Sequence, residues 1–410
     1  MFPVLLQAQS SNAGTPYSRF GLGEVQSFNL VANRSMGGLA VAYFDPLSLN
    51  ITNPAGMGGI RLTTFEFAAA GKFLTLSSNT QTQQQSNFNI NYFVLGFPVT
   101  KKWGAAFGFL PFSTNNYAIS TQVDSSFQKW KEVYNGLGGI NRVFLTNGYS
   151  INDQWHVGVT ANFLFGTLNQ ERRIEFPDTT LTFNVRIQDE VRLADANFQL
   201  GVQYRRKLSN DRKITAGAVV ELPTNMNATR TFLADRFTYR LGSILVRDTV
   251  SDVPSTKGSV LLPLAYSFGL TYEIGTRWLF GIEARMQDWS DFSFLGSADS
   301  LRNSMTLSGG AQYVPDANAA GKSNYFKTIR YRTGFRYNSS YLQLRDQPIN
   351  EVGITVGATL PIRRSNSAVS VAYEGGIRGT TSNGLIREQF NRVSIAFTLN
   401  DRWFIKRKYD

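Results

Sequence analysis

The sequence predicts an all-β protein, a 14-stranded antiparallel transmembrane β-barrel with an N-terminal plug in its lumen. Three observations lead to this prediction. Runs that alternate with period two recur along the chain from Arg61 onward, the connections between these runs are alternately short and long, and aromatic residues gather beside the short connections.

The composition limits the classes of protein to which the chain can belong. The 410 residues are 42% hydrophobic and 13% aromatic, which excludes a disordered chain. Cysteine is absent, which excludes a disulfide framework and any thiolate chemistry. The net charge of +12 comes from scattered charges, which favours a solvated surface over a nucleic-acid site. No window contains the ~18 consecutive apolar residues that a membrane helix needs.

The strand pattern is clearest in three segments, near 155–166, 351–362 and 392–399. In the first, Val157, Val159 and Ala161 alternate with Gly158 and Thr160, so that one face is apolar and the other small or polar. Fourteen such runs are predicted, near 61–76, 86–99, 103–119, 134–150, 155–170, 190–207, 213–226, 261–275, 278–290, 303–314, 326–338, 349–362, 368–379 and 388–399.

The connections after even-numbered runs are mostly short, and those after odd-numbered runs are mostly long, the largest spanning about 227–259. An even strand count with short turns at one rim and long loops at the other is typical of an outer-membrane barrel. A soluble β-sandwich also alternates, but aromatic residues such as Trp103, Trp155 and Trp278 lie beside the short turns, where an interfacial girdle belongs.

The chain before the first strand divides into two parts. Residues 1–10 have the apolar core and small residues of a remnant signal segment. Residues 11–59 include an apolar, glycine-bearing stretch without strand alternation, and a barrel of this width is either open or plugged, so we expect these residues to form the plug. The barrel is assigned to residues 60–400, and 401–410 to a basic periplasmic tail.

Gly37 and Gly38 are followed by Asn53-Pro54-Ala55 ahead of the first strand. This arrangement resembles the hatch of the FadL-like family of outer-membrane transporters for hydrophobic compounds. A glycine-rich third strand ending in Pro111-Phe112 and a Leu262-Pro263-Leu264 segment extend the resemblance. The cluster 17–23 and the ending 403–408 look like the branch found in Bacteroidetes.

The resemblance implies that a hydrophobic molecule leaves through the barrel wall near a kink in the third strand. Gly104, Gly108 and Pro111 weaken or interrupt strand pairing and are the candidate residues for such a lateral opening. The alternative is that they are ordinary barrel-corner glycines and a strand-terminal proline.

Candidate pocket residues follow from the expected lumen-facing parity. Phe93, Leu95 and Phe97 on the second strand are expected to line an apolar pocket or to pack against the plug. Three arginines of the eleventh strand also have inward parity, namely Arg330, Arg332 and Arg336. We expect them to form either a carboxylate site or a salt-bridge network that fixes the plug.

The sequence does not predict an enzyme. His156 is the sole histidine, and no nucleophile motif, metal pair or phosphate loop accompanies it, so no cofactor or metal is expected. Two functions remain open. The chain is a transporter for hydrophobic small molecules such as long-chain fatty acids, working by plug movement and lateral opening, or a docking barrel of an outer-membrane secretion or assembly complex. We expect the outer membrane of a Gram-negative bacterium as its location, with membrane lipid, a lumenal hydrophobic ligand or detergent, or other outer-membrane proteins as partners, and no nucleic acid.

Overall fold

The protein is described by a computed structural model that covers residues 14–125, 128–177, 182–298, 301–317, 319 and 324–402. The predicted signal segment 1–10, the residues 403–408 and nearly all of the predicted tail 401–410 lie outside the described residues. The described elements, in chain order, are η1 (Pro16–Arg19), β1 (Glu24–Val25), α1 (Val31–Arg34), η2 (Pro54–Gly59), β2 (Thr63–Ser77), β3 (Thr82–Pro98), β4 (Trp103–Thr114), β5 (Tyr117–Asp124), β6 (Lys129–Ser150), β7 (Trp155–Glu175), β8 (Asn184–Lys207), β9 (Arg212–Glu221), β10 (Thr224–Arg240), β11 (Ser243–Leu262), β12 (Ala265–Ile274), β13 (Trp278–Gln287), η3 (Trp289–Asp291), β14 (Ser293–Phe294), β15 (Ser297–Ala298), β16 (Ser304–Tyr313), α2 (Tyr325–Thr328), β17 (Arg330–Leu344), β18 (Gln347–Pro361), β19 (Ala368–Arg378), η5 (Ser382–Gly384) and β20 (Arg387–Asp401).

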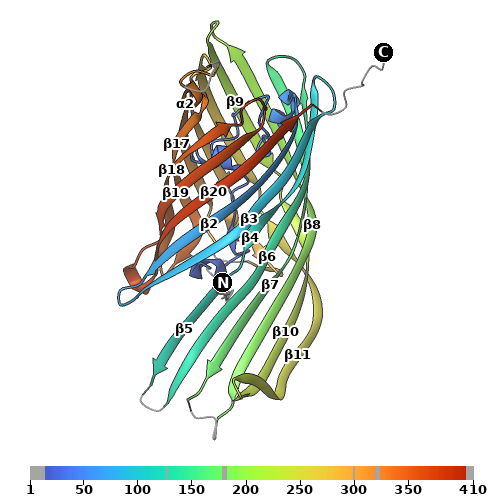
Figure 1. Ribbon diagram of the computed structural model, residues 1–410. Helices are drawn as coiled ribbons and strands as arrows, with labels where there is room; N and C mark the ends of the chain where they lie inside the picture. The colour runs from blue at the N-terminus through green and yellow to red at the C-terminus, as the bar shows by residue number, and fades with distance from the viewer. Residues whose placement is uncertain are drawn as a thin grey trace, which may run out of the picture.

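These strands form one closed antiparallel sheet, because β20 pairs with β2 along its whole length, from Thr63 opposite Asp401 to Ser77 opposite Arg387 (Figure 1). Three of the fourteen barrel strands consist of two segments each, namely β4 with β5, β9 with β10, and β11 with β12. Pro223 and Pro263 lie in two of the three interruptions, where a residue without a backbone donor ends the ladder. The predicted 14-stranded barrel is confirmed.

The outward face of the barrel is apolar. Phe163 on β7, Ile282 on β13 and Ile354 on β18 are exposed on this face, as expected where a barrel strand meets lipid. Trp103, Tyr149 and Trp155 flank the short turns, and Trp155 packs on Tyr204 with ring centroids 4.8 Å apart. An aromatic girdle therefore lies at the rim with the short turns.

The two rims differ. At the short-turn rim the connections are mostly tight, but the one between β16 and β17 covers residues 314–329 and contains α2, so it is longer than the short turns expected there. The opposite rim lacks the long loop expected over 227–259. Those residues form most of β10 and β11, joined at Leu241-Gly242, and three register shifts hid their alternation.

Beyond the barrel, six strands continue as a sheet that we call the projecting sheet. It consists of β5, residues 129–137 of β6, 167–175 of β7, 184–192 of β8, 229–240 of β10 and 243–257 of β11. Figure 1 shows it extending well past the β2–β3 hairpin on one side of the molecule.

The described part of the N-terminal region, from residue 14 to about residue 60, lies inside the barrel. Leu39, Val41 and Met57 are fully buried, and the backbone of this region bonds to several wall strands. We call these residues the plug. The first described residues lie at the long-loop rim. The Tyr17 hydroxyl donates to the carbonyl of Ile386, which places that end beside the β19–β20 connection at the long-loop rim.

Candidate functional site

Asn53 connects the plug to the barrel wall. Its side-chain Nδ2 donates to the carbonyl of Val41 in the plug at 2.7 Å and to the carbonyl of Val202 on β8 at 3.2 Å. Its Oδ1 accepts the backbone N–H of Ala55 at 3.1 Å and so caps η2, whose first residue is Pro54. The prediction that Asn53 bonds to plug or wall backbone is confirmed, and both kinds of bond are present.

Gly37 and Gly38 form a turn that brings the plug close to the opposite side of the wall. Gly37 has φ +72°, and a Cβ on it would lie 2.4 Å from the carbonyl oxygen of Phe335 on β17. Its N–H donates to Oγ1 of Thr355 on β18 at 2.8 Å. Only glycine fits here, because both the backbone angle and the contact exclude a side chain.

The plug is bonded around the barrel rather than along one side. The N–H groups of Ala40 and Val41 both donate to Oε2 of Glu283 on β13, at 2.8 and 2.7 Å. Tyr92 on β3 accepts from the N–H of Val31, and Thr271 on β12 donates to the carbonyl of Ala42. With Asn53 bonded to β8 and Gly37 to β18, these hydrogen bonds alone join the plug to five wall strands.

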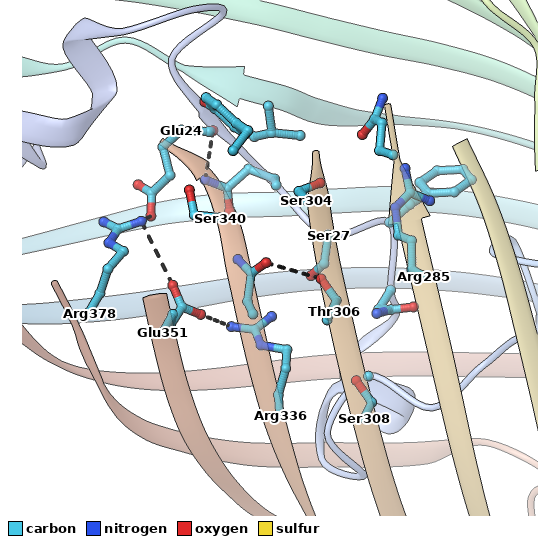
Figure 2. Close-up of a pocket in the computed structure, with 18 of the residues that line it drawn as sticks. Glu24, Ser27, Arg285, Ser304, Thr306, Ser308, Arg336, Ser340, Glu351 and Arg378 are labelled. Carbon is cyan, nitrogen blue, oxygen red and sulfur yellow. Dashed lines mark hydrogen bonds and ion pairs between the residues drawn. The ribbon is translucent and has the colours of Figure 1, made fainter. Parts of the chain in front are cut away.

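A cavity of about 210 Å³ lies between the plug and the long-loop rim, and its lining is strongly charged. Figure 2 shows Arg378, Glu351 and Arg336 in a row along β19, β18 and β17, with Glu24 of the plug at one end. Arg336 Nη2 lies 2.5 Å from Glu351 Oε1 and 2.6 Å from Oε1 of a second carboxylate, Glu374.

Glu24 joins this network to β2 as well. Its Oε1 lies 2.8 Å from Lys72 Nζ and 3.1 Å from Arg378 Nη1. Six cationic and four acidic side chains line the cavity, and they are Lys72, Arg142, Arg285, Arg336, Arg378, Arg392, Glu24, Glu221, Glu283 and Glu351. Charged side chains need polar surroundings, which an apolar ligand does not provide. The cavity therefore suits water and ions better than an apolar ligand.

The three arginines of β17 do not form one site. Arg330 pairs with Asp45 of the plug beside a second cavity of about 1280 Å³ at the short-turn rim. Arg332 is buried and donates from Nε to Gln312 Oε1 at 2.9 Å, and Arg336 belongs to the other cavity. Each therefore bonds to the plug or to neighbouring strands.

Phe93, Leu95 and Phe97 lie on the outward face of β3, not in the lumen. Phe93 is 41% exposed and stacks on Phe109 of β4, while Tyr92 and Val94 are buried on the lumen side. The inward direction was predicted from the polar residues Asn87, Asn89 and Asn91. A β-bulge at Asn91 reverses the alternation, because Ile90 pairs with Ala69 and Tyr92 with the adjacent Ala68, which leaves Asn91 without a partner in β2. One extra residue moves every later side chain to the other face.

Gly104 and Gly108 lie within a regular part of the wall, where β3 and β4 pair from Pro98 opposite Gly104 to Phe93 opposite Phe109. The pairing stops there, just before Pro111. On its other side β4 pairs with β6 from Trp103 to Thr114, and beyond the last β3 pair its Ser113 and Thr114 pair with β1 of the plug. The wall gap is thus beyond Phe109, further toward the long-loop rim than the candidate residues Gly104 and Gly108.

Three residues that hold the plug were not singled out from the sequence. Glu24 lies in a polar stretch without a pattern, and Tyr92 follows the bulge that reverses parity. Arg142 on β6 is 5% exposed, with its guanidinium 4.4 Å from the Phe28 ring centroid and 4.8 Å from that of Phe112. The sequence signal that could have identified Arg142 was its inward position in the alternation of the predicted fourth strand.

The projecting sheet has paired charges on both faces. Arg230 Nη2 lies 2.6 Å from Asp189 Oδ2, and the hydrogen bond to this carboxylate raises the pKa of Arg230 above its usual value. Arg186 Nη2 lies 2.6 Å from the buried Asp235 Oδ2 on the other face. Within the described part of the chain, β5 pairs only with β6, and residues 243–257 of β11 pair only with β10, so both edges of this sheet are unpaired.

No helix among the described residues is long and apolar enough to cross a membrane. The same residues contain no cluster of three or more His, Asp or Glu side chains that could hold a metal ion.

Comparisons with solved structures identify the fold. A FadL homologue from Pseudomonas aeruginosa aligns with a TM-score of 0.62 at 12% identity, covering 92% of this chain and 99% of that one. The toluene transporter TodX from Pseudomonas putida aligns with a TM-score of 0.58 at 14% identity, over 92% and 99%. The monoaromatic hydrocarbon channel CymD aligns with a TM-score of 0.56 at 14% identity, over 93% and 99%. The barrel therefore has the FadL-like fold.

No curated protein matches the sequence. The family model described as BamG matches residues 1–410, the whole chain. The chain belongs to the BamG family.

Proposed function

We propose that this chain is an outer-membrane docking barrel, an accessory subunit of a protein secretion or assembly complex in a Gram-negative bacterium of the Bacteroidetes branch. The observation that carries the proposal is the projecting sheet. A pore needs no six-stranded sheet beyond its rim, and a long sheet with two unpaired edges offers backbone groups that another protein can bind.

The lumen supports the same proposal. The plug is joined by hydrogen bonds to at least five wall strands, and the cavity above it is lined by ten charged residues. An apolar compound on its way through such a chamber would displace water from charged groups without replacing their hydrogen bonds, which is costly. The apolar residues Phe93, Leu95 and Phe97 add no pocket, because they face outward.

Transport of hydrophobic compounds such as long-chain fatty acids, by plug movement and lateral opening, is the second candidate. The gap that follows the last β3–β4 pair, Phe93 opposite Phe109, favours it. The similar structures include a toluene transporter and a monoaromatic hydrocarbon channel, which favour the same function.

A plug that is covalently fixed to the wall distinguishes the two functions, because only the proposed transport requires the plug to move. A Cβ at Gly269 of β12 would lie 3.3 Å from the Cβ of Ala42 in the plug, close to the ~3.5–4.5 Å of a disulfide. The chain has no cysteine of its own, so the double variant Ala42→Cys with Gly269→Cys forms one defined tether. The single variants Ala42→Cys and Gly269→Cys are the matched controls.

For a docking barrel, the oxidised double variant restores growth of a deletion strain as well as the reduced one does. Uptake of a hydrophobic fluorescent probe is then the same with the tether closed or open. Loss of uptake and growth on oxidation, with recovery on adding a reductant, would instead establish transport by plug movement.

A further inference from the structure

The gap in the wall exposes an edge of β3 that pairing with β4 leaves uncovered. From Phe93 onward β3 has partners on both sides, but Asn87 to Ile90 pair only with β2, and Asn91 is the bulge residue. No strand pair joins these residues to any element on the β4 side in the part of the chain that the structure describes. We call residues 87–91 of β3 the open edge.

The open edge lies where the wall faces lipid. Phe88 is 74% exposed and Ile90 is 62% exposed, and both are large apolar side chains on the outward face. Backbone groups that face lipid without a hydrogen-bond partner cost several kcal/mol each. Something with backbone donors and acceptors is therefore expected to cover this edge in the membrane.

The edge has none of the usual protection against pairing with another chain. Natural edge strands are blunted by charged side chains or proline. Between Lys72 and Lys101 the sequence contains no Asp, Glu, Lys or Arg, and its single proline, Pro98, lies at the paired end of β3.

On the β4 side of the gap, a segment of the plug is already added to the wall as a short strand. Glu24 and Val25 of the plug pair antiparallel with Thr114 and Ser113 of β4, and the N–H of Gln26 donates to the carbonyl of Phe112 at 2.8 Å. Lys72 and Arg378 hold Glu24 in place by ion pairs. One edge of the gap is thus covered by a short extended segment, and the other is not.

We propose that the open edge binds an extended segment of a partner protein, which adds to β3 as a β-strand and closes the wall. This inference rests on the proposed docking function and adds a second binding surface to the projecting sheet. The segment that fits has no charge where it passes the edge, apolar residues toward lipid beside Phe88 and Ile90, and polar residues toward the lumen beside Asn87 and Asn89. Backbone hydrogen bonds supply the affinity and this alternation supplies the specificity.

The test compares the complex purified from native membranes with the barrel refolded alone in nanodiscs of the same lipid. Amide hydrogen exchange is measured for a peptide that covers residues 82–92, with 390–398 of β20, paired on both sides, as the control. We expect exchange of the open-edge amides to be at least ten times slower in the complex, and exchange of the control peptide to be unchanged.

A photo-crosslinking phenylalanine analogue then identifies the occupant. Placed at Phe88 it yields an adduct with a segment of five to eight alternating residues in one partner, and placed at Ile395 on β20 it yields none. Asn87→Pro and Phe88→Pro complete the set, each with the analogue at Ile90, which is also exposed on the outward face, because successive N–H groups point to opposite sides of a strand. We expect the proline variant at the position whose N–H points into the gap to fold normally but to lose the adduct.

Equal exchange in the complex and in the isolated barrel, an adduct with lipid only, or an adduct with the residues before Gly14 of the same chain overturns the strand-addition proposal while leaving the docking function in place. Recovery of the barrel without any partner protein overturns both.

Discussion

Asn53 is the residue through which the plug, its own turn and the wall are joined. Replacing it with leucine removes the donors to the carbonyls of Val41 and Val202 and the acceptor for Ala55, at a fully buried position. The buried N–H of Ala55 then loses its acceptor, which costs ~1–3 kcal/mol, whereas the carbonyl of Val41 keeps the hydrogen bond from Gln203 Nε2. We expect Asn53→Leu to unfold at lower temperature and to raise ion leakage in a planar bilayer.

Asn366→Leu is the matched control, because Asn366 is exposed in the turn between β18 and β19. Conductance and unfolding temperature equal to the parent in Asn53→Leu would show that the plug does not depend on this side chain.

Gly108 gives a second prediction at this scale. Its Cβ would lie 2.5 Å from the Phe93 carbonyl oxygen and 2.9 Å from the Phe144 ring, so valine there meets a closed wall rather than an opening. We expect Gly108→Val to fold poorly, with little of the heat-modifiable band in gel electrophoresis. Ala118→Val on the exposed face of β5 should fold normally. A well-folded Gly108→Val barrel would contradict the pairing described for β3 and β4.

Single residues show where sequence reasoning succeeds and where it fails. Asn53 was identified because Asn-Pro-Ala is a local motif that precedes the first strand, and the Asn side chain caps the turn that Pro54 begins. Phe93, Leu95 and Phe97 were placed on the wrong face because the bulge at Asn91 reverses parity, and alternation alone does not show a bulge.

At the scale of elements, β1 determines how far the gap is closed. Glu24→Gln removes the negative charge that pairs with Lys72 and Arg378, while keeping the shape of the side chain. We expect amide exchange in residues 21–28 to become roughly ten times faster, which corresponds to about 1.4 kcal/mol. Glu132→Gln, in the projecting sheet, is the control, and unchanged exchange in Glu24→Gln would show that β1 is held by its backbone bonds alone.

The cores of all fourteen strands were predictable, because the outward face is apolar wherever lipid surrounds the barrel. Strand extensions were not. In β7 the outward residues change from Phe163 and Phe165 to Asn169 and Glu171, since this part lies beyond the apolar band, and the pattern that marks a strand disappears although the strand continues. For this reason the β10–β11 hairpin was expected to be a loop.

At the scale of the whole molecule, the barrel and the projecting sheet are expected to be separable. Replacing residues 231–255 with Asn-Gly shortens β10 and β11 to the pair Arg230 and Thr256 without touching the wall. We expect this variant to insert and to show the parent's heat-modifiable mobility, but to lose the growth function and its partner proteins. A tag inserted after Asn383, in the β19–β20 connection, is the control, and full function of the shortened hairpin would contradict a docking role for the projecting sheet.

The most direct test of the docking account is native mass spectrometry of the barrel extracted from its own outer membrane under mild detergent. The account predicts a complex of fixed stoichiometry that contains one copy of this chain and other outer-membrane proteins, with no hydrophobic ligand retained in the lumen. A monomeric barrel that carries a fatty acid or another apolar compound would contradict it and establish transport.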